Sequence, residues 1–384
     1  VPLARSVLTI QGSPMKEISK TYKVRLYPNQ EQETLLRKQI GCNRFVYNGL
    51  LGLCKRRFKK GMKTLSAFDL MKLLPKGKEK YPWLKEVDSD ALQGSAKDLG
   101  TAFQNFFKSL SGKRKGPKLA PPVFKKRENG GSFRINNKGR VSLKNNTLTV
   151  GKHKSIRFRG TAPPKRCPPR AISVSLEPTG FWFASILVLE KIKPLKKTGV
   201  DVGIDPGLKT LATLVASDGR KGKFNPEARD KINELSLRID RLQMWRSKKA
   251  RGSSRYKKIS IQIARLWYRV RCTRSNMIHN FTKKVVTRFD RIHHEDTSTK
   301  NMSTKGGKYK TGLNRSILNA ALTQIKTQLV YKASWYQKQV VLVNPRNTSK
   351  TCNSCGLIFQ GLKLSMRKWK CLDCGATHDR DLNA

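Results

Sequence analysis

Apolar and polar positions change their spacing twice in the first third of the chain. Residues 21–26 alternate apolar and basic side chains ahead of a Tyr-Pro-Asn turn, which predicts a half-buried strand. Over residues 30–60 the apolar positions recur near every 3.6 residues, which predicts one or two basic amphipathic helices. Another helix is expected over residues 88–110, with Asp88 or Ser89 as its N-cap.

Residues 123–190 return to a spacing of two, interrupted by Asn and Gly turns. The segments 172–176 and 181–189 read as strands, joined by a Pro-Thr-Gly hairpin turn at residues 178–180. Several short, closely spaced strands are typical of a small barrel. We expect the strand at residues 21–26 to belong to the same barrel, so that the helices between them are an insertion.

The second half of the chain mixes strands with long helices. Two strands are expected within residues 198–216, around the Asp-Pro-Gly sequence at 205–207. The remaining elements follow in order: a helical pair at 226–288 broken at 251–254, a strand at 291–294, a Gly-rich loop at 303–314, a helix at 315–338 and a strand at 340–343. Together with the first half, this pattern predicts a multidomain α/β protein.

Charge narrows the class of partner. The 384 residues include 81 Lys or Arg and only 25 Asp or Glu, which gives a formal net charge of +56. Such a surface repels itself unless a polyanion neutralises it, so the charge favours nucleic acid over a small metabolite. An anionic membrane is the weaker alternative, because no run of about 18 apolar residues exists. After residue 240 the acids are Asp290, Glu295, Asp296, Asp373, Asp379 and Asp381.

The cysteines and the first residues bear on the compartment. Four of the eight cysteines lie scattered at positions 42, 54, 167 and 272, which is unlike a secreted disulfide scaffold and favours a reducing cytosol. Residues 1–14 lack the features of a signal peptide. We expect them to be a tag or an upstream remnant, with Met15 as the native start.

The other four cysteines form two CxxC pairs separated by fifteen residues, and a glycine follows each pair. Four thiolates at this spacing predict a zinc ribbon, in which Cys352, Cys355, Cys371 and Cys374 bind one ion. A redox pair would use a single motif. Because four thiolates leave no open coordination position, the zinc is expected to be structural.

Three carboxylates stand at positions suited to a second kind of metal site. Asp205 follows the apolar run 199–204, Glu295 ends the strand at 291–294, and Asp381 follows the second CxxC pair. Carboxylate oxygens suit Mg²⁺ or Mn²⁺, and two such ions about 4 Å apart can hydrolyse a phosphodiester. The residues alone leave other roles open: a turn residue at 205, a solvated strand end at 295, and a helix N-cap at 379 or 381.

These segments together resemble the TnpB family, insertion-sequence nucleases related to type V CRISPR effectors. The resemblance is carried by GIDPGLKTLAT, the strand end at Glu295, TSKTCNSCG with the second CxxCG, HDRDLNA, and the N-terminal KVRLYPNQEQ and RFVYNGLL. It spans about residues 20–384.

The resemblance implies a RuvC-like, RNase H-type nuclease domain with an inserted zinc ribbon, and a small wedge β-barrel with an inserted helical recognition domain. The implied catalytic and magnesium-binding residues are Asp205, Glu295 and Asp381, with Asp205 preferred over Asp201 and Asp381 over Asp379. The implied domains are 15–28 for the first barrel strand, 29–116 for the recognition domain, 117–196 for the rest of the barrel, 197–350 for the nuclease domain, 351–375 for the ribbon and 376–384 for the last catalytic segment.

The resemblance also implies partners. A guide RNA would pair with double-stranded target DNA, a short motif beside the target would be read by protein, and cleavage would use two Mg²⁺ or Mn²⁺ ions. The expected setting is the prokaryotic cytoplasm, at the nucleoid. Candidate nucleic-acid contacts are Arg246, Lys248, Lys249, Arg251, Arg255, Lys257 and Lys258, together with Tyr47, Asn48 and Gln93. Two alternatives are an unguided transposase or recombinase-like nuclease and a non-catalytic zinc-ribbon regulator.

Overall fold

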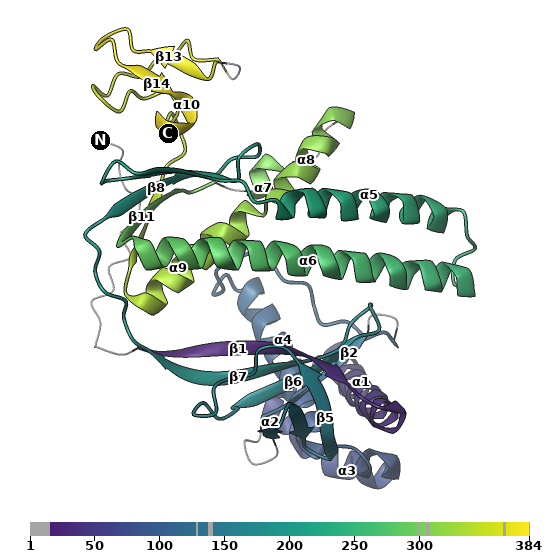
Figure 1. Ribbon diagram of the computed structural model, residues 1–384. Coiled ribbons are helices and arrows are strands. Elements are labelled where there is room, and N and C mark those ends of the chain that lie inside the picture. The colour runs from purple at the N-terminus through teal and green to yellow at the C-terminus, as the bar shows by residue number, and fades with distance from the viewer. Residues whose placement is uncertain are drawn as a thin grey trace. The chain divides into compact units, whose positions relative to one another are not determined.

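The computed structural model describes residues 16–127, 130–136, 141–297, 299–304, 307–363 and 366–383. The expected tag or remnant at residues 1–14 lies outside these ranges. Within them the chain forms two compact units, residues 17–190 and residues 191–384 with Lys16. Each unit has a sheet of its own (Figure 1).

The helices of the 17–190 unit form as their capping residues predict. They are α1 (Gln30–Lys59), α2 (Ala67–Lys72), α3 (Leu74–Lys80), the 3₁₀ turn η1 (Pro82–Lys85) and α4 (Ser89–Leu110). The region expected to hold one or two helices is the single helix α1, which begins with a capping box between Asn29 and Gln32. Asp88 caps α4, because its side chain accepts hydrogen bonds from the amides of Asp90 and Ala91.

Seven strands of the described chain make the sheet of this unit. They are β1 (Lys16–Tyr27), β2 (Gly131–Ile135), β3 (Val141–Lys144), β4 (Thr147–Val150), β5 (His153–Arg159), β6 (Ala171–Leu176) and β7 (Trp182–Ile192), in the order β2-β6-β7-β1-β5-β4-β3. The first strand therefore lies between β7 and β5, although the helices separate it from them in sequence. Val24, Phe133, Ile156 and Ile186 share one buried core with Leu36 of α1, so the helical segment packs on this sheet.

The 191–384 unit contains a mixed sheet. Its strands are β8 (Asp201–Asp205), β9 (Ala212–Ala216), β10 (Lys221–Phe224), β11 (Arg291–Glu295) and β12 (Gln339–Val343), in the order β10-β9-β8-β11-β12 among the described residues. β11 pairs in parallel with β8 and β12, whereas β9 pairs antiparallel with β8 and β10. The carboxyl ends of β8, β11 and β12 therefore lie at one edge of the sheet.

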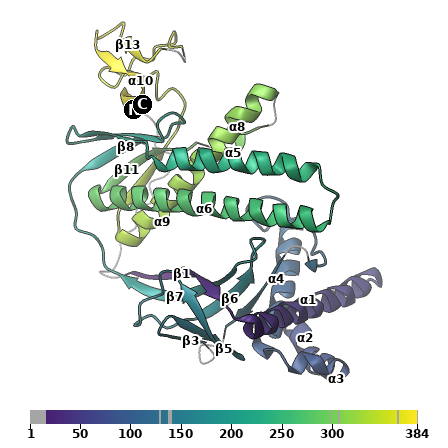
Figure 2. The same ribbon diagram turned by 45° about the vertical axis from the view of Figure 1, so that its right-hand side comes forward.

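Helices cover this sheet and extend from it. They are α5 (Ala228–Ser247), α6 (Ser254–Arg288), α7 (Thr299–Met302), α8 (Lys308–Ala320), α9 (Leu322–Tyr336) and α10 (Arg380–Asn383), and a small hairpin pairs β13 (Lys368–Lys370) with β14 (Thr377–Asp379). Phe281 of α6 and Ile325 of α9 share the core of Val202 and Ile292. α5 and α6 run side by side as a long pair in both views (Figures 1 and 2). None of the described helices has both the length and the apolarity to cross a bilayer.

The structure corrects the sequence-based assignment in three places. Residues 308–314 were expected in a loop but begin α8, and the chain breaks instead at Ala321, whose φ of 52° separates α8 from α9. The basic, Gly-containing start of α8 masks its helical spacing, which only Leu313 and Ile317 reveal. The edge strand β10 was not expected, because its sequence KGKF carries little apolar signal. The short helices α2 and α3 were also missed.

Candidate metal sites and comparison with known proteins

The three predicted carboxylates come together at one edge of the five-stranded sheet. Asp205 ends β8 and Glu295 ends β11, and the parallel register pairs Ile204 with His294 just before them. Asp381 lies in α10, which packs beside β9. The charges of Glu295 and Asp381 both act on Asp205. Segments separated by 176 residues in the sequence thus place three acids in one neighbourhood.

Burial and mutual repulsion dominate the electrostatics of this cluster. Burial raises the pKa of Asp205 to about 6, repulsion from Glu295 and Asp381 adds to the rise, and Arg380 opposes it. Burial also raises the pKa of Glu295, against a hydrogen bond that Thr348 Oγ1 donates to Glu295 Oε1 at 2.7 Å. The pKa shifts show that negative charge is disfavoured here unless a cation neutralises it.

The donor set fits a hard divalent cation. Across the described parts of the chain, neither Asp205 nor Glu295 forms an ion pair with a Lys or Arg side chain, so both carboxylates can still take a cation as a ligand. Asp381 is paired with Arg367 through an N–O distance of 3.0 Å, and both side chains are exposed. An exposed ion pair contributes little and can exchange for a metal ion. Oxygen ligands of this kind suit Mg²⁺ or Mn²⁺.

The neighbouring acids have structural partners. Asp379 caps α10, because its Oδ1 accepts hydrogen bonds from the amides of Asp381 and Leu382 at 3.0 and 3.2 Å. Asp296 pairs with Lys326 at 2.9 Å. Asp201 is at the opposite end of β8 from Asp205, 3.5 Å from Arg291. The helix-cap role that the sequence left open between 379 and 381 therefore falls to Asp379.

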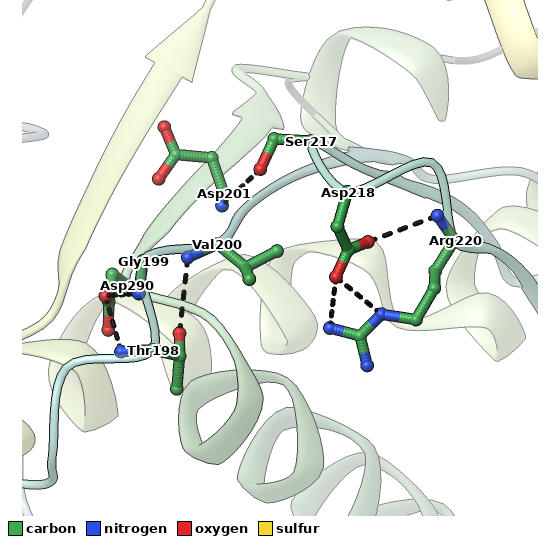
Figure 3. A network of polar contacts seen from close by, with 8 residues as sticks. All are labelled: Thr198, Gly199, Val200, Asp201, Ser217, Asp218, Arg220 and Asp290. Atoms are coloured by element: carbon green, nitrogen blue, oxygen red, sulfur yellow. Dashed lines mark hydrogen bonds and ion pairs between the residues drawn. The ribbon is translucent and has the colours of Figure 1, made fainter.

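A second polar network lies at the amino-terminal end of the same strands (Figure 3). Asp290, just before β11, accepts hydrogen bonds from the amides of Thr198 and Gly199 at 2.8 and 2.7 Å, and it forms an ion pair with the buried Lys338. These hydrogen bonds and the Lys338 charge outweigh burial and lower the pKa of Asp290. Asp290 thus ties the start of β8 to the start of β11.

The four predicted cysteines form a compact cluster. Their Sγ atoms all lie within 4.8 Å of one another, and no other group of three or more potential ligands packs as closely in the described residues. The Cys352–Cys374 and Cys355–Cys371 Sγ distances are both 3.6 Å. A tetrahedral ion with bonds of about 2.3 Å requires sulfur separations of about 3.8 Å, so the geometry fits zinc.

The surroundings of the cysteines explain their arrangement. Gly356 and Gly375 adopt φ values of 82° and 69°, which favour glycine, and their amides bond back to Cys352 and Cys371. Trp369, which is 4 % exposed, stacks on Phe359 and packs on His378. His378 Nε2 lies 3.0 Å from Cys352 Sγ, a contact that the sequence analysis missed. The module thus has a small apolar core beside the ligand set.

The predicted nucleic-acid contacts differ in their surroundings. The basic residues from Arg246 to Lys258 lie around the α5–α6 turn, away from the sheet in both views (Figures 1 and 2), and all of them are exposed except the half-buried Arg246 over the Tyr256 ring. In the other unit Gln93 is exposed. Tyr47 is only 7 % exposed and lies under the Lys125 amine, and the Asn48 amide bonds both backbone groups of Lys125. Tyr47 and Asn48 therefore serve internal contacts.

Sequence reasoning also missed the polar residues that touch the carboxylates. Thr348 donates to Glu295, and Arg367 pairs with Asp381. Both lie next to the cysteine pairs, in segments whose evident sequence features are metal ligands and positive charge. The TSKTC sequence that begins at Thr348 was the available signal.

Family models match three parts of the chain. A Helix-turn-helix domain model of the OrfB/IS605 type matches residues 15–63, where the described structure is strand β1 followed by the single helix α1. A model described as "Probable transposase" matches residues 183–305, and the Cas12f1-like TNB domain matches residues 323–384.

Curated relatives and solved structures match most of the chain. A "Putative RNA-guided DNA endonuclease" of Streptomyces pristinaespiralis is 33% identical over 377 residues, covering 96% of this chain and 88% of the relative. InsQ of Escherichia coli, described in the same words, is 30% identical over 375 residues, covering 94% and 89%. The Cas12f1 chain in a complex with sgRNA and target DNA shares the fold, with a TM-score of 0.56 at 14% identity over 97% and 99% of the two chains. The chain therefore belongs to the TnpB family of RNA-guided DNA endonucleases.

Proposed function

We propose that this chain binds a guide RNA and hydrolyses phosphodiester bonds of matching DNA at Asp205, Glu295 and Asp381. The observation that carries this proposal is the convergence of the three acids at the carboxyl edge of the sheet, with the pKa values of Asp205 and Glu295 raised. Ligands of α/β sheets bind outside the carboxyl ends of parallel strands. Perturbed carboxylates at such an edge favour a catalytic centre over a stabilising ion pair.

The same proposal assigns the parts of the fold. The order β10-β9-β8-β11-β12 supports a RuvC-like, RNase H-type nuclease domain, in which the cysteine module lies between the second and third acids as a zinc ribbon. The seven-stranded sheet and helices α1–α4 of the other unit would be the wedge barrel and the recognition domain. The six domain ranges given under Sequence analysis remain our prediction for the boundaries.

Each residue of the carboxylate site would have its own role in phosphodiester hydrolysis. Asp205, Glu295 and Asp381 would hold two Mg²⁺ or Mn²⁺ ions against the scissile phosphate. These ions, when bound, activate water and stabilise the leaving oxygen. The sheet keeps Asp205 and Glu295 fixed, because both end parallel strands that are hydrogen-bonded in register. Arg367 would release Asp381 when the carboxylate turns to an ion, leaving a guanidinium free to contact phosphate.

Charge and exposed aromatics support the polyanionic partners. A net charge of +56 suits a guide RNA and an RNA–DNA heteroduplex held at the same time. Trp245 and Trp267 on the α5–α6 pair are 58% and 43% exposed, beside the basic residues of that pair. The bases of single-stranded nucleic acid stack on exposed aromatic side chains, and its phosphates pair with cationic side chains. A protein acting on genomic DNA would work in the cytoplasm, at the nucleoid.

A guide-exchange experiment tests the proposal. The full chain is expressed from its native locus and purified together with its bound RNA, and the RNA is sequenced. Complexes are then rebuilt with the native guide segment or with a scrambled one of equal length. Each complex is given two plasmid libraries, one per guide, with randomised bases beside the target. We expect each complex to cut only its own library, with Mg²⁺ and not with Ca²⁺. Identical cutting by both complexes, or cutting that survives RNase treatment, would contradict guidance by RNA.

A further inference from the structure

The base of the cysteine module contacts the segments that carry two of the three carboxylates. Thr348, four residues before Cys352, donates its hydroxyl to Glu295. Asn383, two residues after Asp381, bonds with its amide to the backbone on both sides of Cys352. Each contact joins the cysteine ligands to an acid that comes from elsewhere in the chain.

The turn before Cys352 holds Thr348 firmly. The carbonyl of Asn347 accepts hydrogen bonds from the amides of Lys350 and Thr351 and from the Thr351 hydroxyl. The half-buried Thr348 hydroxyl then lies 2.7 Å from Glu295 Oε1, and its second acceptor, the Pro345 carbonyl, is farther away at 3.3 Å. A hydrogen bond to a carboxylate is strong and directional. Thr348 therefore engages Oε1 and leaves Oε2 of Glu295 for another ligand.

Asn383 holds the short helix that carries Asp381. Its Nδ2 donates to the Thr351 carbonyl at 2.7 Å, and its Oδ1 accepts from the Asn353 amide at 3.1 Å. α10 has four residues and could not hold its shape alone, because a single turn does not repay the cost of nucleating a helix. The two hydrogen bonds of Asn383 fix α10 to the backbone that also positions Cys352. The direction of Asp381 thus depends on the cysteine module.

We propose that Thr348 and Asn383 are positioning residues, through which the zinc-binding module sets the geometry of Glu295 and Asp381. The inference rests on the proposed function, since it assigns to these acids the binding of divalent ions. It gives the module a role in the nuclease site besides its own stability: the turn at Cys352 is the shared support of both acids. Partners that orient metal ligands commonly change metal affinity by about 10- to 100-fold when they are lost.

The test compares substitutions of Thr348 that differ in the hydroxyl alone. Thr348→Val keeps the shape and removes the donor, and Thr348→Ser keeps the donor. Mn²⁺ binding to the full chain is measured by electron paramagnetic resonance, with Asp205→Asn marking signal from other sites. Guided cleavage is then followed against Mg²⁺ concentration. We expect Thr348→Val to weaken Mn²⁺ binding and raise the Mg²⁺ requirement by about 10-fold, and Thr348→Ser to stay within about 3-fold of wild type.

Asn383→Leu and zinc content complete the test. Asn383→Leu removes both hydrogen bonds at similar volume, and we expect a loss of Mn²⁺ affinity of about 10-fold, with one zinc per chain retained. If Asn383→Leu releases zinc, the Thr348 pair alone decides. Wild-type affinity in Thr348→Val, or equal losses in Thr348→Val and Thr348→Ser, would overturn the inference. Failure of the proposed function would look different, because the wild-type complex itself would then lack Mg²⁺-dependent guided cleavage.

Discussion

The acidic residues at the two ends of the five-stranded sheet have opposite electrostatic surroundings. At the amino-terminal end, Asp290 accepts hydrogen bonds from two backbone amides (Figure 3). It also forms an ion pair with the buried Lys338, and its pKa is lowered. At the carboxyl end, the half-buried Asp205 and Glu295 lie near another acid, and their pKa values are raised. The strands are the same and the residue types nearly so. The difference is that Asp290 forms an ion pair with Lys338, whereas at Asp205 burial and the neighbouring acids outweigh the charge of Arg380.

This contrast separates a stabilising acid from a ligand. Asp290 is satisfied by the fold, so its charge contributes to holding β8 and β11 together. Asp205 and Glu295 form no ion pair with a Lys or Arg side chain among the described residues, an arrangement that costs folding free energy and can accept an external cation. Proteins accept such costs where function requires them. The position of an acidic residue along these strands therefore indicates its role better than whether it is Asp or Glu.

The largest expected effect distinguishes the two aspartates at opposite ends of β8. Asp205→Asn removes a charged ligand at the carboxyl end, and Asp201→Asn removes an exposed carboxylate at the other end of the same strand. We expect Asp205→Asn to slow guided cleavage by about 10³-fold or more, because metal-ion stabilisation is worth several kcal/mol. Asp201→Asn should stay within about 3-fold of wild type, since its exposed pair with Arg291 contributes little.

Single-turnover cleavage measures both variants, and guide-RNA binding by filter retention serves as the control. RNA binding should be unchanged in each, because neither change touches the basic α5–α6 pair. Equal slowing of cleavage by the two substitutions would mean that the ends of the strand do not differ in function.

The second-largest expected effect is a loss of stability at the amino-terminal end of the sheet. Asp290→Asn leaves the ammonium of Lys338, whose side chain is 2% exposed, without its counter-charge. Removing one partner of such a pair is strongly destabilising, and we expect the unit to lose about 2–4 kcal/mol of unfolding free energy. Urea denaturation followed by hydrogen exchange of peptides from β8 and β11 measures this loss. The double variant Asp290→Asn/Lys338→Met should recover part of it, and a double variant as unstable as the single one would contradict the ion-pair explanation.

The positions of the candidate metal ligands could be proposed largely from the sequence. The four cysteines could be assigned because they lie within 23 residues, so spacing alone fixes their geometry. The placement of Asp205 at a strand end followed from the apolar run before it, whereas the short segment before Glu295 has the sequence RIHH and contains only one apolar residue. Both are local signals that survive without knowledge of the fold.

The partners of those residues could not be predicted in the same way. Thr348 reaches Glu295 across 53 positions and Lys338 reaches Asp290 across 48, and a Thr or Lys in a basic, polar segment carries no mark of its partner. The first half of helix α8 and the strand β10 were missed because their basic, Gly-containing sequences carry few apolar residues. What escapes the sequence is therefore the set of contacts that depends on where other segments go.

The smallest expected effect is a pH dependence of opposite sign at the two ends. The folded pKa of Asp205, about 6, exceeds its unfolded value near 4, so the folded chain binds the extra proton between these pH values. Its contribution to stability therefore falls as pH rises from about 4 to 6. Asp290 has a lowered folded pKa, so its contribution is present above about pH 4 and is lost as pH falls further.

In Mg²⁺-free buffer at pH 7, Asp205→Asn should accordingly stabilise the unit by about 1–2 kcal/mol, with a gain that shrinks toward pH 4. The urea midpoints of β8 peptides at pH 7, 5.5 and 4 measure this, and a gain that is independent of pH would show that the charge of Asp205 is not its source.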